Sequence, residues 1–221
     1  MATPEPQSLL HERVDVGAAR LAARHKGSFS TETVQALIID SRQRLATTAR
    51  VTTHLDVLAE RLAAERLDAL AAMHSAPSSR PARVLFVCGQ NSGRSQIAAA
   101  LLAHRATGSV TVSSAGTSPG AEVEPHLAEV LAEVGADLGP AYPKPLTEEI
   151  VEAADVVVTL GCGDACPVVP GRRYLDWPTP DPQGASLAEL RQIRDAIDAH
   201  IADLVAFLAA PTSPSITTEP K

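Results

Sequence analysis

"VLFVCGQNSGRSQIAAALLAHRA", residues 84–106, contains a strand pattern, a loop and a helix pattern in direct succession. An apolar run of strand length comes first, a loop of small and polar residues follows, and an alanine- and leucine-rich helix pattern closes the segment. A buried strand that leads directly into a helix is typical of a parallel sheet. Ligands of such sheets bind at the carboxyl ends of the strands, which is where this loop begins at Cys88.

Strand and helix patterns alternate along the rest of the chain. Strands are predicted at residues 83–88, 109–116, 155–161 and 172–177. Helices are predicted at residues 94–106, 124–137, 146–154 and 186–209. Because strands alternate with helices and the core strands are apolar, we predict an α/β fold in which an open four-stranded parallel sheet has helices on both faces.

A different pattern precedes the sheet. Residues 8–74 contain three amphipathic helix patterns, and the proline- and serine-rich stretch "SAPSSRPA" at 75–82 follows them. Three short helices bury little apolar surface alone, so we expect a small three-helix bundle of marginal stability. We predict a helical bundle plus linker at 1–80, the catalytic α/β domain at 81–210 and a disordered tail at 211–221. Alanine- and leucine-rich helix faces that the bundle leaves uncovered predict a homodimer through these helices.

Composition excludes several classes of function. A net charge of −7 over 221 residues argues against a nucleic-acid-binding or anionic-membrane-binding surface. The chain has no run of 18 apolar residues, and its N-terminus lacks both a basic start and an apolar signal core, so we expect a cytoplasmic protein. Three cysteines, an odd number, argue against a framework of structural disulfides.

Cys88 and Arg94 frame a loop suited to an oxyanion. Gly89 and Gly93 permit backbone angles that turn successive amides inward, and the start of the next helix adds unpaired N–H groups. The Arg94 guanidinium can hold two oxygens of a tetrahedral oxyanion, and the same positive field favours a thiolate at Cys88. The spacing Cys-x5-Arg-Ser therefore predicts attack of the Cys88 sulfur on a bound oxyanion. The predicted oxyanion-binding residues are Gly89, Gln90, Asn91, Ser92, Gly93, Arg94 and Ser95.

Two neighbours of the nucleophile have more specific roles. Ser95 can donate its hydroxyl to the sulfur, and Asn91 tolerates the left-handed conformation that the turn needs. A nucleotide-binding P-loop would require Gly-Lys-Ser/Thr, which this loop lacks. A glycine-rich turn with an incidental cysteine leaves the set of asparagine, arginine and serine unexplained.

The other two cysteines follow a second core strand, in "GCGDACP" at 161–167. At helical rise, Cys162 and Cys166 would lie roughly 6 Å apart, within the range that a disulfide permits. A zinc site would need four ligands, and this window supplies two, so we predict no metal site. A general acid should come from a separate loop, and Asp181, between two proline-stiffened turns, suits that role better than Asp176.

Residues 83–208 resemble the arsenate reductases that share the low-molecular-weight tyrosine phosphatase fold. The matching pieces are "VLFVCGQNSGRSQIAAALL", "SSAGTSPG", "LTEEIVEAADVVVTLGCGDACP" and "YLDWPTPDP". The resemblance implies that Cys88 is the nucleophile toward arsenate, with phosphate or sulfate as competing oxyanions, and that Asp181 is the acid. The N-terminal helices resemble the small bundle fused to some actinobacterial members.

The resemblance also implies a redox cascade. Cys162 would attack the Cys88–arsenic adduct, so that arsenite leaves and a Cys88–Cys162 disulfide forms. Cys166 would then displace Cys88, and the resulting Cys162–Cys166 disulfide would be reduced by thioredoxin, with no bound cofactor. The spacing between these two cysteines is shorter than in better-known thioredoxin-coupled members. Ala99 stands where some relatives have a glutamate that helps hold potassium, so we predict no potassium ion.

Three alternatives remain at this level. A protein tyrosine phosphatase would use the same loop and acid but has no use for Cys162 and Cys166, and it commonly has a tyrosine where Gln183 follows Asp-Pro. A mycothiol-dependent arsenate reductase would need Cys88 only. An oxyanion-binding regulator would need a recognition helix, which nothing basic in residues 1–80 resembles.

Overall fold

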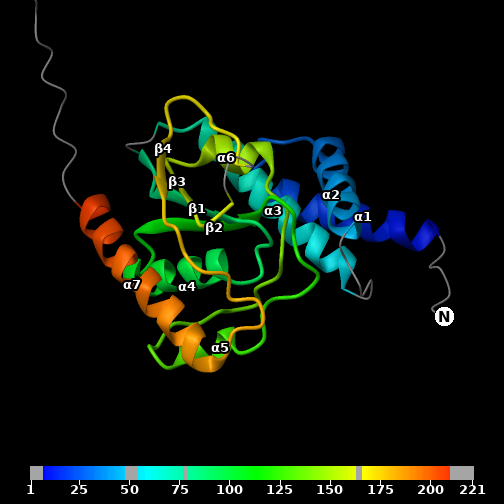
Figure 1. Ribbon diagram of the computed structural model, residues 1–221. Coiled ribbons are helices and arrows are strands. Elements are labelled where there is room, and N and C mark those ends of the chain that lie inside the picture. Colours follow the sequence, from blue (N-terminus) through cyan, green and yellow to red (C-terminus); the bar gives the residue numbers. More distant parts are fainter. Residues whose placement is uncertain (1–6, 48–53, 77–78, 163–165, 210–221) are drawn as a thin grey trace, which may run out of the picture.

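The computed structural model describes residues 7–47, 54–76, 79–162 and 166–209. Its sheet is built from β1 (Ala82–Cys88), β2 (Val110–Gly116), β3 (Val156–Thr159) and β4 (Arg173–Asp176). The strands are all parallel, in the order β2-β1-β3-β4. The prediction of an open four-stranded parallel sheet is therefore confirmed (Figure 1). The predicted tail at 211–221 lies outside the described residues.

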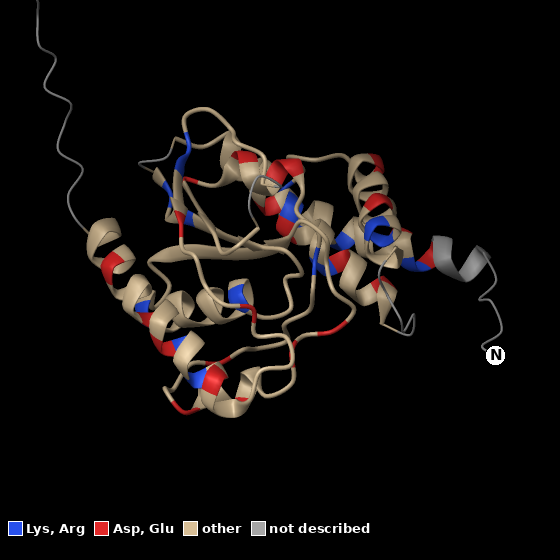
Figure 2. Cartoon of the chain, viewed as in Figure 1, with Lys and Arg blue, Asp and Glu red and all other residues tan. Residues whose placement is uncertain are grey.

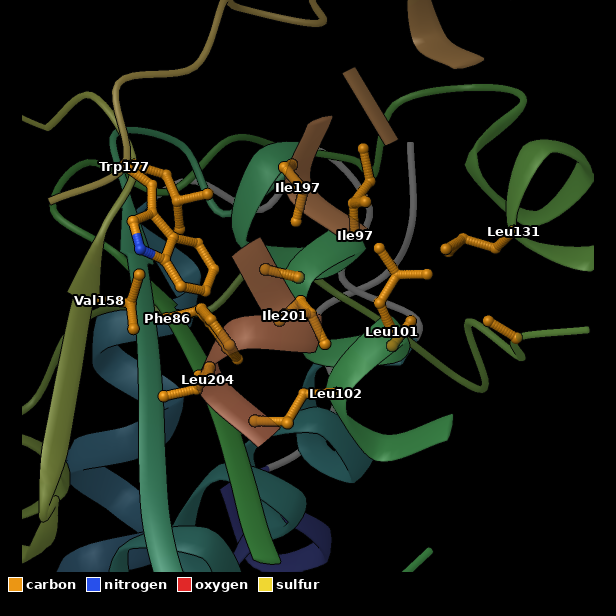
Figure 3. Packing of buried hydrophobic residues seen from close by; sticks show 14 of the residues in the cluster. Phe86, Ile97, Leu101, Leu102, Leu131, Val158, Trp177, Ile197, Ile201 and Leu204 are labelled. Atoms are coloured by element: carbon orange, nitrogen blue, oxygen red, sulfur yellow. The ribbon is translucent and has the colours of Figure 1, made fainter. Parts of the chain in front are cut away.

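One face of the sheet is covered by helices that follow β1 in the chain. These are α4 (Arg94–Ala106), α5 (Leu127–Ala132) and α7 (Leu187–Ala209). Phe86 of β1 packs here with Trp177 and with the aliphatic side chains of α4 and α7, as Figure 3 shows. Phe86 is fully buried, and its ring centroid lies 5.8 Å from that of Trp177. This apolar layer holds the carboxyl end of β1 against the start of α4.

The opposite face is covered by α6 (Glu148–Ala153) together with α3 (Leu55–Met73). Leu85 and Val87 of β1 point to this side, because successive side chains of a strand alternate between faces. Leu62 of α3 is fully buried in the same cluster. The N-terminal helices thus form part of the layer that covers the sheet, and they are not held by a bundle core alone.

The bundle itself consists of α1 (Gln7–Arg24), α2 (Thr31–Ala46) and α3. Val34, Ile38 and Leu67 are among the buried residues of its own core. Charged side chains of both signs gather on these helices and along α7, whereas the strands carry few (Figure 2). No helix among the described residues is long and apolar enough to cross a bilayer.

Several predicted elements are shorter in the structure, among them the strand predicted at 155–161, which forms over Val156–Thr159, but one helix is shortened most. The helix predicted at 124–137 forms only over Leu127–Ala132. His126 before it is left-handed at φ 69°, and Gly135 after it has φ 77°, so the backbone leaves the helical region at both ends.

Candidate active site

Backbone hydrogen bonds to the segment after β2 shape the loop between β1 and α4. Four amides within residues 117–124 donate, at N···O distances of 2.8–3.1 Å, to the carbonyl oxygens of Cys88, Gly89, Gln90 and Ser92. In a trans peptide the carbonyl and the following N–H point in opposite directions, so the next residues' amides face the other side of the loop. A Cβ on Gly116 would lie 2.9 Å from the loop backbone, which explains glycine at this close approach. The loop therefore presents amides to a ligand, as an oxyanion requires.

A chain of hydrogen bonds orients the partners of the Cys88 sulfur. The backbone N–H of Asn91 donates to Sγ at 3.2 Å, and the Ser95 Oγ lies 3.0 Å from Sγ. The backbone N–H of Lys144 can only donate, and it lies 3.0 Å from Asn91 Oδ1. The Asn91 side-chain nitrogen must therefore face Ser95 Oγ, 2.9 Å away. Ser95 accepts this bond and keeps its own proton for Cys88, so two hydrogen bonds stabilise negative charge on the sulfur.

Arg94 and Asp181 face each other across the loop. An Nη2–Oδ2 distance of 2.9 Å joins them, and Arg94 Nη1 also donates to the Thr179 carbonyl oxygen at 3.2 Å. Arg94 is buried and the Asp181 side chain is 55% exposed, so the carboxylate comes from the solvent side. Asp176, at the end of β4, instead accepts a hydrogen bond from Thr159. The structure thus brings one of the two predicted acid candidates, Asp181, to the loop.

The acid loop also contacts the nucleophile loop directly. A Cβ on Gly93 would lie 2.2 Å from Pro182 Cγ, so no side chain fits at this position without moving one of the loops. Beside the contact opens a cavity of about 190 Å³, lined by Gln90, Ser92, Gln183 and residues 120–125. None of these lining residues is aromatic, whereas two of them, Glu122 and Glu124, are acidic.

Cys162 lies just after β3, at the same edge of the sheet. Its Sγ is 3.7 Å from the carbonyl oxygen of Val87, the residue before the nucleophile. Cys166 is buried in the apolar cluster under α3 and α6, and residues 163–165 between the two cysteines lie outside the described residues. The three cysteines are free thiols.

The two later cysteines have opposite tendencies to ionise. A hydrogen bond from the Cys166 thiol lowers the pKa of Cys162 to about 7, against the opposing effect of burial. The same hydrogen bond, burial and the neighbouring negative charge raise the pKa of Cys166 well above its usual value. Cys162 is therefore the more acidic thiol of the pair, and Cys166 is its hydrogen-bond donor.

Several contributors to the site were not predicted from the sequence motif. Gln96 Nε2 donates to the Asn91 carbonyl oxygen at 3.0 Å and to the Tyr142 carbonyl oxygen at 3.1 Å, although its position directly after Ser95 could have suggested it. Lys144 and Tyr142 lie about fifty residues from the loop in sequence, so only the fold shows their contribution.

Two family models match the chain. Residues 15–71 match the protein-tyrosine-phosphatase-like N-terminal domain, and residues 83–213 match the low molecular weight phosphotyrosine protein phosphatase. Among curated relatives, a putative arsenate reductase of Halobacterium salinarum is 33% identical over 54% of this chain and 87% of its own length. The glutaredoxin arsenate reductase of Synechocystis sp. is 32% identical over 58% of this chain and 98% of its own length.

A solved structure extends the similarity to the N-terminal helices. The thioredoxin-dependent arsenate reductase of Corynebacterium glutamicum is 42% identical to this chain, with a TM-score of 0.78. The match covers 88% of this chain and 95% of that one. A tyrosine phosphatase of Erwinia amylovora, at 20% identity and a TM-score of 0.53, shares the fold of the sheet region.

Proposed function

The chain belongs to the low molecular weight phosphotyrosine protein phosphatase family, and we propose that within it the chain is an arsenate reductase, converting arsenate to arsenite. The observation that carries the proposal is the position of Cys162, a second, acidic cysteine beside the strand end that holds Cys88. A phosphatase needs one nucleophilic sulfur, whereas reduction of arsenate needs two electrons, which two thiols supply on forming a disulfide.

In the first step the loop amides and Arg94 hold the arsenate oxygens. The Cys88 thiolate forms a bond to arsenic, and one arsenate hydroxyl takes a proton from Asp181 and leaves as water. Displacement of the Arg94–Asp181 ion pair by the oxyanion would free both groups for these roles. Arsenic is still pentavalent in the resulting Cys88–arsenic adduct.

In the second step the Cys162 thiolate attacks the sulfur of Cys88. The sulfur–arsenic electron pair stays on arsenic, which leaves as arsenite, and a Cys88–Cys162 disulfide forms. Two of the three causes that raise the pKa of Cys166 depend on Cys162 being a thiol or thiolate, and the disulfide removes them. Cys166 would therefore become a nucleophile only after Cys162 has reacted, which orders the cascade.

In the third step Cys166 attacks Cys162, releases the Cys88 thiolate and forms the Cys162–Cys166 disulfide. We propose thioredoxin as the reductant of this disulfide, since the Corynebacterium glutamicum protein is described as thioredoxin-dependent. Such a reductant implies a reducing compartment, and we place the protein in the cytoplasm.

We also propose a homodimer through the N-terminal helices. Val16 of α1 and Val57 of α3 are 66% and 61% exposed, and a second copy could cover these apolar side chains. Light scattering at micromolar concentration tests this proposal.

Arsenate-dependent NADPH oxidation with thioredoxin and thioredoxin reductase tests the function. We expect turnover by the wild type and none by Cys162→Ser. The Cys166→Ser variant should release one arsenite per chain and then stop at the Cys88–Cys162 disulfide. Turnover by Cys162→Ser with mycothiol and mycoredoxin would instead establish the single-cysteine mechanism. Hydrolysis of para-nitrophenyl phosphate without arsenate reduction would establish a phosphatase, against which the absence of aromatic residues lining the cavity beside the loop argues.

A further inference from the structure

Helix α3 of the N-terminal bundle contacts residues 142–144, a segment that follows β2 in the catalytic part of the chain. The Glu65 carboxylate forms an ion pair with the Lys144 ammonium, and their side chains are 29% and 11% exposed. One turn earlier, the Arg61 guanidinium lies 4.7 Å from the centroid of the Tyr142 ring. Tyr142 and Lys144 are both buried, so α3 fixes the side chains of this segment from one side.

The backbone of the same segment fixes the nucleophile loop from the other side. The Lys144 N–H donates to Asn91 Oδ1, and the Tyr142 carbonyl oxygen accepts from Gln96 Nε2. The Lys144 carbonyl oxygen also accepts from the Gly116 N–H at 2.9 Å, which ties the segment to the end of β2. Residues 142–144 therefore lie between α3 and the loop. Their side chains contact α3, and their backbone contacts the loop.

The loop partner of this segment controls the sulfur. Asn91 is fully buried and left-handed at φ 50°, a conformation that asparagine tolerates better than most residues. Its side-chain amide faces Ser95 in the orientation that leaves the serine proton for Cys88 because its oxygen accepts from two donors, the Lys144 N–H and, at 3.1 Å, Gln96 Nε2. Gln96 Nε2 is itself held by the Tyr142 carbonyl oxygen, so residues 142–144 support both donors. A displaced segment 142–144 would remove the Lys144 donor and the Tyr142 anchor of Gln96, which weakens the hold on the Asn91 amide and on the donor role of Ser95.

We propose that Glu65 of the N-terminal helices is a positioning residue for the catalytic cysteine, acting through Lys144, Asn91 and Ser95 on Cys88. The N-terminal helices then support the active-site loop from the side opposite the substrate. Where arsenate turnover is measured, this proposal rests on the proposed arsenate reductase activity. The reactivity of Cys88 toward an alkylating reagent tests the proposal without arsenate.

The test removes the ion pair without changing the net charge, in the double variant Glu65→Gln/Lys144→Met. The matched control is Arg20→Met/Glu60→Gln, which removes an ion pair between α1 and the same helix α3, away from the sheet. Alkylation by iodoacetamide is followed at about pH 7 by mass spectrometry of the tryptic peptide 84–94, in which Cys88 is the only cysteine.

We expect the double variant to slow alkylation of Cys88 about threefold or more, with the rate at Cys162 unchanged and both rates unchanged in the control. Arsenate turnover should fall in kcat by a similar factor, with KM within about twofold. General loosening of the fold would act in the opposite direction, because it would expose the buried Cys88 and speed its alkylation. A Cys88 rate equal to or above that of the wild type overturns the proposal.

If the double variant does not fold, two single variants at Lys144 provide the test. Lys144→Arg keeps the ion pair and should retain the Cys88 rate, whereas Lys144→Met should slow it; equal rates in these two variants overturn the proposal. If the wild type reduces no arsenate, the proposed function fails, and the alkylation rates still decide the role of Glu65.

Discussion

Arg66 of α3 forms ion pairs both within the N-terminal helices and with the catalytic part of the chain. Its side chain is 4% exposed and pairs with Glu149 of α6 at 2.7 Å and with Asp40 of α2 at 2.6 Å. It also donates to Ser41 Oγ at 3.0 Å. Substitution Arg66→Met keeps most of the apolar stem and removes every one of these bonds.

The expected loss follows from the burial of the three charges. Breaking a buried ion pair by removing one partner costs about 3–5 kcal/mol. The side chains of Asp40 and Glu149 are 39% and 21% exposed and would regain water, so we discount the loss in unfolding free energy to about 2–3 kcal/mol. For a chain of this size, that lowers the melting temperature by about 5–10 °C. Arg20→Met, whose side chain is 72% exposed, should cost less than about 1 kcal/mol.

The loss should depend on pH with a defined sign. Burial raises the pKa values of Glu149 and Asp40, but hydrogen bonds from Arg66 and, at Asp40, from Arg44 more than offset it, so both lie below their usual values. A depressed folded-state pKa stabilises above the unfolded value and loses its effect as pH falls through the folded value. The difference between wild type and Arg66→Met should therefore shrink below about pH 4.

Urea unfolding followed by far-ultraviolet circular dichroism and by Trp177 fluorescence measures this prediction. Trp177 is the only tryptophan and lies in the catalytic part, so a helical signal lost before its fluorescence changes would show the N-terminal helices detaching first. An unfolding free energy for Arg66→Met equal to that of Arg20→Met would refute the assignment of Arg66 as the joining residue.

Three further outcomes are expected. Cys166→Ala removes the hydrogen bond that lowers the pKa of Cys162, so the midpoint of Cys162 alkylation should rise from about pH 7 toward that of a free thiol; an unmoved midpoint contradicts this cause. Gly93→Ala places a methyl group against Pro182 and should lower arsenate turnover about tenfold with the fold retained, as checked by circular dichroism. Gly161→Ala requires an unfavourable φ of 69° and puts a carbon 2.5 Å from the guanidinium of the loop arginine, so phosphate inhibition should weaken; an unchanged inhibition constant counts against that arginine as the oxyanion ligand.

Local patterns were sufficient for the sheet and for the identity of the loop. The apolar runs, the glycines around Cys88 and the helix that begins at Arg94 all express preferences set within a few residues along the chain. Apolar periodicity overestimates the helix at 124–137, because it does not show the left-handed His126 after which the helix begins.

Such patterns could not predict where the N-terminal helices pack. An amphipathic face shows that a helix packs against something but not against what, and the expectation of uncovered faces did not anticipate that α3 lies on the sheet of its own chain.

The order of events at the sulfur depends on contacts across large sequence separations. Arg94 and Asp181 are 87 residues apart, Lys144 and Asn91 are 53 apart, and Lys144 and Glu65 are 79 apart. Residue types and spacing in "CGQNSGRS" were enough to identify a nucleophile and an oxyanion cradle, because that chemistry is local to one turn. Which groups orient the nucleophile, and which of the other two cysteines ionises, depends on burial and on hydrogen-bond partners that only the folded chain brings together.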